Sequence, residues 1–155
     1  MDNRSASARP WPGKAWKYVL PVLTLVFIWG HSCVPIPESR EESARVAGWL
    51  TPFLELFVGG GNVTDHLVRK LAHFAEFAFL GFQIYLLRTG RKWRDALLAV
   101  ELSFFAAFLD ESIQMLSGRG DQIIDVWLDL AGAVFGVLAA MLISWVVRGT
   151  TLYRE

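Results

Sequence analysis

The stretch "FLDESIQMLSGRGDQIIDVWLDLAG", Phe108–Gly132, decides how this sequence is interpreted. Five acidic residues, a glutamine and an arginine interrupt two apolar runs here. A solvent-exposed turn accounts for residues 117–120. It does not account for Asp110, which follows six apolar residues, or for Asp129, which has apolar neighbours on both sides. Two apolar segments that carry acids therefore flank a short turn. The question is why acids occur inside apolar segments.

The composition favours a membrane protein. The length of 155 residues predicts one domain, and the hydrophobic share of 54% exceeds that of an ordinary soluble domain. Lys+Arg and Asp+Glu number 15 each, so the charge balance gives no indication of a nucleic-acid partner. The single cysteine, Cys33, excludes an intrachain disulfide framework and a cysteine-rich metal site. No glycine-rich phosphate loop and no His-Glu-x-x-His sequence occurs, so no soluble cofactor motif is present and the cofactor is unknown at this point.

Four apolar segments approach the roughly 20 residues that cross a bilayer as a helix. We expect an all-α, integral membrane bundle of four transmembrane helices, with spans at about 17–36, 66–88, 95–117 and 121–148. The first is interpreted as an uncleaved span, because no small-x-small cleavage site follows it. These spans form a single membrane domain over residues 17–150, after a tail over residues 1–16.

Apolar residues also recur at helical spacing between the first two spans, over about 39–58. This pattern predicts an amphipathic extracytoplasmic helix that lies in the membrane interface. A soluble-type helix packed over the bundle is the alternative. Basic residues are concentrated before the first span, in the 88–94 turn and after the last span. The positive-inside rule therefore predicts a multi-pass membrane protein with both termini cytoplasmic.

In this topology, three spans carry polar residues to the same depth, just under the outer surface. Lys70, His73 and Glu76 are spaced i, i+3, i+6 in the second span, and Asp110, Glu111 and Gln114 end the third. Asp121, Asp125 and Asp129 form a stripe at i, i+4, i+8 where the fourth begins, and Arg119 lies in the turn above. Ionisable residues at membrane depth are costly, and they normally face inward, pair and serve function.

These residue types suggest catalysis by acidic residues, with or without a metal, and binding of a charged substrate. The candidate catalytic residues are Glu76, Asp110, Glu111, His73 and Asp125, and a divalent metal is possible on His73, Glu76, Asp110 and Asp125. The candidate substrate-binding residues are Lys70, Arg119, Gln114, Asp129 and Asp121. Lys70 and Arg119 suit a phosphate or carboxylate of a substrate. The acids outnumber the bases even if His73 is charged, so the surplus calls for a metal, protonated carboxylates or a cationic ligand.

Four hypotheses follow. The protein is an enzyme at the outer leaflet, or a binding protein without catalytic activity. The third hypothesis is an ion-coupled carrier. The fourth is a structural protein whose polar cluster holds the helices together. The carrier is less favoured, because the acids stop in the outer half and only Glu101 lies toward the cytoplasm. In every case, the lipid bilayer is the surrounding partner.

Two blocks of the sequence resemble the VanZ-like membrane protein family. They are "KLAHFAEFAFLGF", Lys70–Phe82, and "LDESIQMLSGRGDQIIDVWLDLAGAVFG", Leu109–Gly136. Phe77 stands where the family usually has tyrosine, and Asp129 where asparagine is usual. The resemblance implies a small multi-span protein of the bacterial cytoplasmic (inner) membrane. The substrate or ligand that it implies is a lipid-linked cell-envelope molecule or a lipoglycopeptide. It also implies low-level teicoplanin resistance as an activity of the family's named member, but it supplies no biochemical reaction.

Overall fold

The computed structural model of the chain describes residues 15–34, 64–87, 93–117 and 124–152, with single positions between 45 and 55. All regular structure in these ranges is helical, so the all-α prediction is confirmed for them. The elements are a 3-10 turn, Ala15–Tyr18, and the helices α1 (Val19–Ser32), α3 (Asp65–Leu87), α4 (Trp93–Leu116) and α5 (Asp125–Leu152). Most of the interfacial helix predicted over about 39–58 and most of the tail over 1–16 lie outside the described residues. The four positions described within the predicted helix, 45, 48, 52 and 55, are helical.

Local chemistry explains where the helices begin. The side chain of Thr64 caps α3, since its Oγ1 accepts the backbone N–H of Leu67 at 3.2 Å. Asp95 and Asp125 stand in the first turns of α4 and α5, where a carboxylate interacts favourably with the positive end of the helix dipole. Pro21 stands near the start of α1, where the N–H that proline lacks would have no helical partner. The four α-helices thus fall on the four apolar segments of the sequence.

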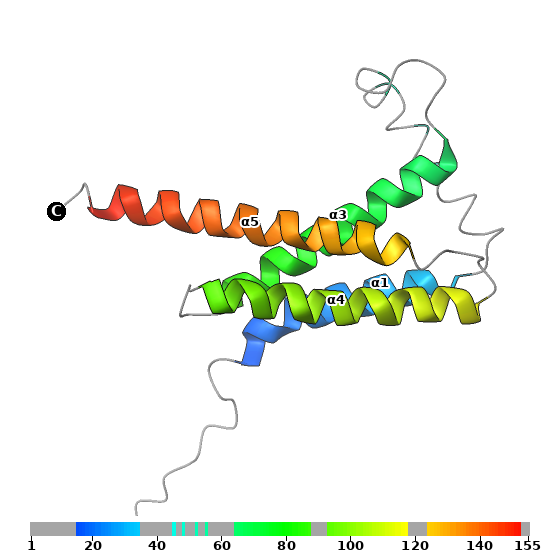
Figure 1. Ribbon diagram of the computed structural model, residues 1–155, viewed down its shortest axis with the longest axis horizontal. Coiled ribbons are helices and arrows are strands. Elements are labelled where there is room, and N and C mark those ends of the chain that lie inside the picture. The colour runs from blue at the N-terminus through cyan, green and yellow to red at the C-terminus, as the bar shows by residue number, and fades with distance from the viewer. Residues whose placement is uncertain are drawn as a thin grey trace, which may run out of the picture.

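Consecutive helices run in opposite directions (Figure 1). The last turns of α1 and α4 therefore lie at the same end of the bundle as the first turns of α3 and α5. We call this the polar end. Helix α3 runs obliquely across α5 and packs against it more extensively than any other described pair of helices packs. Helix α1 contacts both α3 and α4.

Backbones touch where α3 and α5 cross. A Cβ atom added to Gly132 would meet the backbone oxygen of Phe74, and one added to Gly136 would meet that of Ala78. Gly81 of α3 faces the backbone of α5 in the same way. Small residues allow this close approach, which transmembrane helices use in place of a hydrophobic driving force. The small-residue pair Gly132 and Gly136, which the sequence indicates, lies at this crossing.

Most buried apolar side chains form one cluster that draws on all four α-helices, and many of them are small. The core consists of Ile28, Phe77, Leu80, Ile84, Tyr85, Ala99, Ala106, Ala107, Val126, Ala133, Val137 and Ala140. Polar contacts join α1 to its neighbours: Thr24 and Gln83 hydrogen-bond across α1 and α3, and the Trp29 indole N–H donates to the Ala106 carbonyl at 3.3 Å. The bundle is therefore held by close packing and a few polar contacts between helices.

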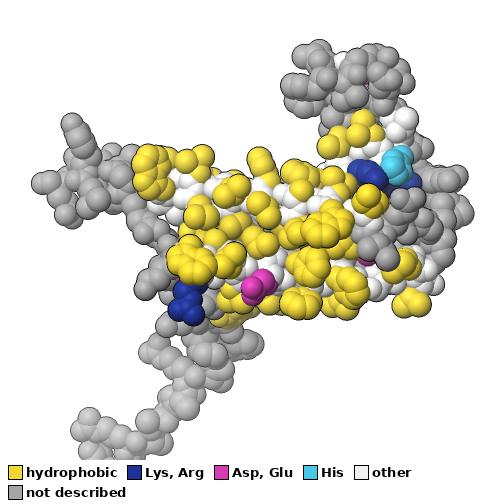
Figure 2. Space-filling view, in the orientation of Figure 1, with side chains coloured by type: hydrophobic (Ala, Val, Ile, Leu, Met, Phe, Trp, Pro, Cys, Tyr) yellow, Lys and Arg dark blue, Asp and Glu magenta, His cyan; other side chains and the backbone are white. Residues whose placement is uncertain are grey.

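Large apolar side chains also cover the outer surface (Figure 2). Phe105 of α4 is 62% exposed, Phe135 of α5 is 60% exposed and Trp145 of α5 is 73% exposed. Among the described helices, length and composition identify one that is able to cross a membrane, α5 over Asp125–Val147, and 33% of its apolar 18-residue window is buried. Helix α1 is similarly apolar but shorter.

Candidate functional site

Asp110 is the most deeply buried acid at the polar end, with 0% of its surface exposed. Ser32, the last residue of α1, donates its hydroxyl to Asp110 Oδ1 at 2.6 Å. Gln114 donates through Nε2 to Asp110 Oδ2 at 2.6 Å, and lies 3.4 Å from the Ser32 Oγ. Each oxygen of this carboxylate thus accepts a hydrogen bond, which fixes its orientation and joins α1 to α4.

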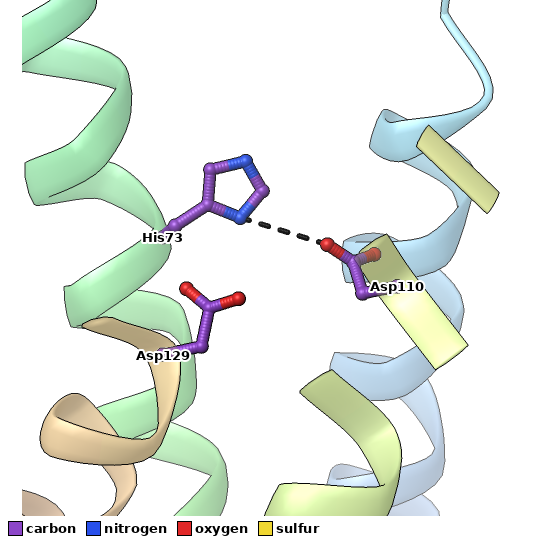
Figure 3. A group of neighbouring side chains, drawn as sticks. All are labelled: His73, Asp110 and Asp129. Atoms are coloured by element: carbon purple, nitrogen blue, oxygen red, sulfur yellow. Dashed lines mark ion pairs between the residues drawn. The ribbon is translucent and has the colours of Figure 1, made fainter. Parts of the chain in front are cut away.

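His73 of α3 lies between the acids of its neighbours. Its Nδ1 is 3.7 Å from Asp110 Oδ2 and 4.0 Å from Glu76 Oε2. Figure 3 shows His73 and Asp129 on one side, with their side chains directed toward Asp110 on the other. One nitrogen or oxygen of each of these three residues lies within 4.8 Å of the others. Three helices, α3, α4 and α5, therefore bring ligand-type atoms to one point.

Asp129 has the least compensated environment of these acids. Its side chain is 1% exposed, and neither of its carboxylate oxygens has a hydrogen-bond partner within the part of the chain that the structure describes. Glu76 Oε2 likewise accepts no hydrogen bond from a described residue. Burying a carboxylate away from donors carries a large desolvation penalty. Selection for stability alone does not account for an aspartate at this position.

The rim of the polar end is more solvated. Lys70 of α3 forms an ion pair with Asp125 of α5, with Nζ and Oδ1 2.7 Å apart and side-chain exposures of 34% and 17%. Ion pairs that water reaches contribute little to stability. This pair is thus better suited to meeting a ligand than to holding the helices together.

A cavity of about 30 Å³ opens between the rim and the buried acids. His66, Arg69 and Lys70 line one part, and Glu111, Asp125 and Asp129 line another. A polar cavity of this size holds one or two water molecules or a small ligand group. Basic groups and buried acids thus share one space.

The structure brings together every predicted site residue that it describes. These are Lys70, His73, Glu76, Asp110, Glu111, Gln114, Asp125 and Asp129. Arg119 and Asp121 lie outside the described residues. The catalytic, substrate-binding and metal-binding roles assigned to these residues from the sequence stay predictions.

Three residues of the site escaped the sequence analysis. His66 and Arg69 line the cavity, and Ser32 bonds to Asp110. The spacing of His66, Lys70 and His73 at i, i+4, i+7 places them on one helix face, and this signal was available. No comparable signal marks Ser32, because a single hydroxyl at the end of an apolar helix is common.

Comparison with protein families identifies the chain. The family model described as VanZ/LLP1 matches residues 17–144, a range that runs from the turn before α1 into α5 and contains the whole polar end. No curated protein and no solved structure matches the chain. The family match covers well over half of the sequence and confirms the resemblance of the two motif blocks. The chain belongs to the VanZ/LLP1 family.

Proposed function

We propose that the protein is a multi-pass protein of the bacterial cytoplasmic membrane, in which α1, α3, α4 and α5 all cross the bilayer. The 23 residues of α3 and the 24 of α4 correspond to about 35 Å of helix. That length exceeds the roughly 30 Å of a bilayer's hydrocarbon core. Polar residues lower the mean hydropathy of both helices, but buried ones such as Asp110 and Gln114 face the bundle interior, which leaves an apolar outer surface.

The shorter α1 also suits a span when the turn before it is included. Its 14 residues add up to about 21 Å as α-helix. The four residues of the preceding 3-10 turn, Ala15–Tyr18, add about 8 Å. Val22, Val26 and Phe27 are more than half exposed along α1, which suits contact with lipid.

The proposed topology places the polar end on the extracytoplasmic side. Lys17 and Arg94 stand at the starts of the first and third spans, at the opposite end of the bundle, as the positive-inside rule requires of cytoplasmic ends. Cys33 is exposed next to the end of α1, and it is the single cysteine of the chain. An impermeant thiol reagent is therefore expected to label Cys33 on intact cells. Trp93→Cys in a Cys33→Ser background is the matched control, and it should be labelled only after lysis; the reverse pattern would invert the topology.

At the polar end, the protein binds or acts on the polar part of a lipid-linked cell-envelope molecule. The observation that carries this proposal is the cavity that basic and acidic side chains share at one end of an apolar bundle. Arg69 and Lys70 suit a phosphate, because guanidinium and ammonium groups form charge-assisted hydrogen bonds with its oxygens. Arg69 Nε has no hydrogen-bond partner among the described residues, so it is available to donate.

An apolar groove supports a ligand with a hydrocarbon tail. The groove has a volume of about 850 Å³, is lined by α1, α3 and α4, and extends from Lys17 to Leu109. Ala106 and Leu109, which line it, lie within one helical turn of Asp110. Its volume is in the range of ligand pockets in proteins, roughly 300–1,000 Å³. We assign this groove to the tail of the same lipid-linked molecule.

A second candidate function is structural, and the bonds of Asp110 favour it. Ser32, Asp110 and Gln114 form a buried network between α1 and α4, which would lock the bundle without binding anything.

An ion-coupled carrier has less support. Ser103 is the one buried polar residue of α4 between Asp95 and Asp110, and a relay normally needs ionisable groups along its whole path.

Drug susceptibility tests the proposal in cells. Wild type is expressed in a susceptible Gram-positive host beside Glu76→Gln and Lys70→Met, with membrane levels matched, and minimal inhibitory concentrations of teicoplanin and vancomycin are recorded. A teicoplanin-selective rise that both variants lose is the expected result. Glu101→Gln removes an exposed carboxylate of α4 outside the polar end and is the matched control.

Lipid analysis tests binding without reference to resistance. Purified wild type should retain a phosphate-containing lipid that Lys70→Met retains less of, as mass spectrometry of extracted lipids will show. An equal lipid content in the two proteins, together with unchanged susceptibility of the wild type, would leave the structural function. Conversion of an added lipid-linked precursor would establish an enzyme rather than a binder.

A further inference from the structure

We propose that His73, Asp110 and Asp129 bind one divalent transition-metal ion at the polar end. These three residues come from α3, α4 and α5, so the ion would join the three helices at one point. The proposal goes beyond the binding of a lipid-linked molecule, because it concerns a site that forms without that ligand.

The spacing of the ligand atoms fits one ion. Atoms that bind the same Zn²⁺ at about 2.0–2.2 Å lie at most about 4.4 Å apart. His73 Nδ1 and Asp110 Oδ2 are 3.7 Å apart, inside this limit. The three residues together offer atoms within 4.8 Å of one another, so side-chain shifts of a few tenths of an ångström complete the site.

Asp129 supplies the second, independent observation. It is 1% exposed, its two carboxylate oxygens have no hydrogen-bond partner among the described residues, and Figure 3 shows it directed toward Asp110 and His73. A carboxylate that serves only packing would be hydrogen-bonded or replaced by a neutral residue. A cation between these residues supplies the compensation that the described side chains do not give Asp129.

The bonds around Asp110 match those of a metal ligand. Carboxylates that bind metals are themselves held by hydrogen bonds, which fix the direction of the ligand atom. Ser32 and Gln114 hold Asp110 in this way, each at 2.6 Å. Both donors are neutral, so they orient the carboxylate without neutralising its charge.

The ligand types select the metal. One imidazole and two carboxylates form a mixed nitrogen and oxygen set, which suits Zn²⁺ or Mn²⁺ better than the all-oxygen preference of Mg²⁺ or Ca²⁺. His73 and Asp129 also line the 30 Å³ cavity, so an exchangeable coordination position would face the space where the phosphate of a ligand enters. Metal sites with three protein ligands and one open position are typical of catalytic centres.

Metal analysis of the full-length purified protein tests the site. The protein is stripped with chelator in detergent and then dialysed against Zn²⁺ or Mn²⁺, with Mg²⁺ and Ca²⁺ as comparison ions. About one bound Zn²⁺ or Mn²⁺ per chain is expected by elemental mass spectrometry. Added metal should also raise the unfolding temperature of the stripped wild type. Neither readout uses the lipid-linked ligand, so failure of this proposal is distinguishable from failure of the proposed function.

Variants assign the metal to these residues. Asp129→Asn and His73→Phe are each expected to weaken metal binding by at least about tenfold, a loss comparable to that seen when metal-site residues are changed. Asp95→Asn, which alters a buried aspartate at the other end of α4, is the matched control and should bind metal as the wild type does. Absence of stoichiometric metal in the wild type would overturn the proposal, and so would equal metal binding by wild type and Asp129→Asn. If His73→Phe does not fold, Asp129→Asn decides the test alone.

Discussion

The α3–α5 crossing and the polar end are built in opposite ways. At the crossing, the backbones touch and glycines such as Gly136 leave no room for a Cβ atom. At the polar end, a cavity of about 30 Å³ remains, and Asp129 is buried without a hydrogen-bond partner among the described residues. The crossing is packed as densely as backbone contact allows, whereas the polar end keeps space and charge that stability alone would remove.

The contrast separates residues that fold the protein from residues that are available for binding. Proteins tolerate destabilising features where function needs them and compensate for them elsewhere. The close approach of α3 and α5 is the compensation here. Substitutions at the crossing are therefore expected to change folding most, while those of Asp129 and Lys70 at the polar end are expected to change binding more than folding.

The largest effect is expected from Gly136→Ala. The new Cβ atom would overlap the backbone oxygen of Ala78, so α3 and α5 must separate, and overpacking of this kind costs about 1–3 kcal/mol or more. Thermal unfolding in detergent measures the loss. Gly30→Ala in α1 is the control, because no atom outside the adjacent backbone lies within 4 Å of its added Cβ. It should unfold at the wild-type temperature or slightly above, since alanine favours a helix more than glycine does. An unchanged unfolding temperature for Gly136→Ala would contradict the close crossing.

Asp110→Ala should be the next most damaging change, and it shows how far the polar end also holds the fold. The substitution leaves Ser32 and Gln114 without their buried acceptor, at a cost of about 1–3 kcal/mol for each group. A double-mutant cycle with Ser32→Ala measures the coupling between α1 and α4 in the same unfolding assay. If the losses in free energy of unfolding are additive, the hydrogen bond between Ser32 and Asp110 does not stabilise the contact of α1 with α4.

Asp129→Asn should have a smaller effect of the opposite sign. Removing a buried negative charge that lacks a donor is expected to stabilise the metal-free protein by about 0.5–2 kcal/mol, while the response to Zn²⁺ or Mn²⁺ disappears. Unfolding temperatures with chelator and with metal give both quantities from one preparation. A destabilised metal-free variant would place Asp129 with the structural residues and remove the contrast between the two regions.

Lys70→Met should change stability least. The ion pair with Asp125 is 34% and 17% exposed, so its loss is expected to alter the free energy of unfolding by less than about 1 kcal/mol. Retention of phosphate-containing lipid should nevertheless fall. Leu71→Met, at the next and 40% exposed position of α3, is a matched surface control. A variant that keeps its lipid would move the binding site away from the rim.

The sequence was sufficient to locate the helices and the polar end. The apolar segments are long enough to predict four helices, and the alternating direction of short-connected helices puts the start of α3 beside the end of α4. The spacing of Lys70, His73 and Glu76 showed one polar face, because helical periodicity depends only on residue number. The family resemblance rested on these same residues, and the VanZ/LLP1 match bears it out.

Only the tertiary structure decided which polar residues meet. Helical spacing defines a face but not the rotation of that face toward a neighbour, so it did not distinguish Asp125, which pairs with Lys70, from Asp129, which faces His73. It gave no reason to join Ser32 to Asp110, because they are 78 residues apart. The rotation follows from the crossing of α3 and α5, where glycines set how close and at what angle two backbones pack.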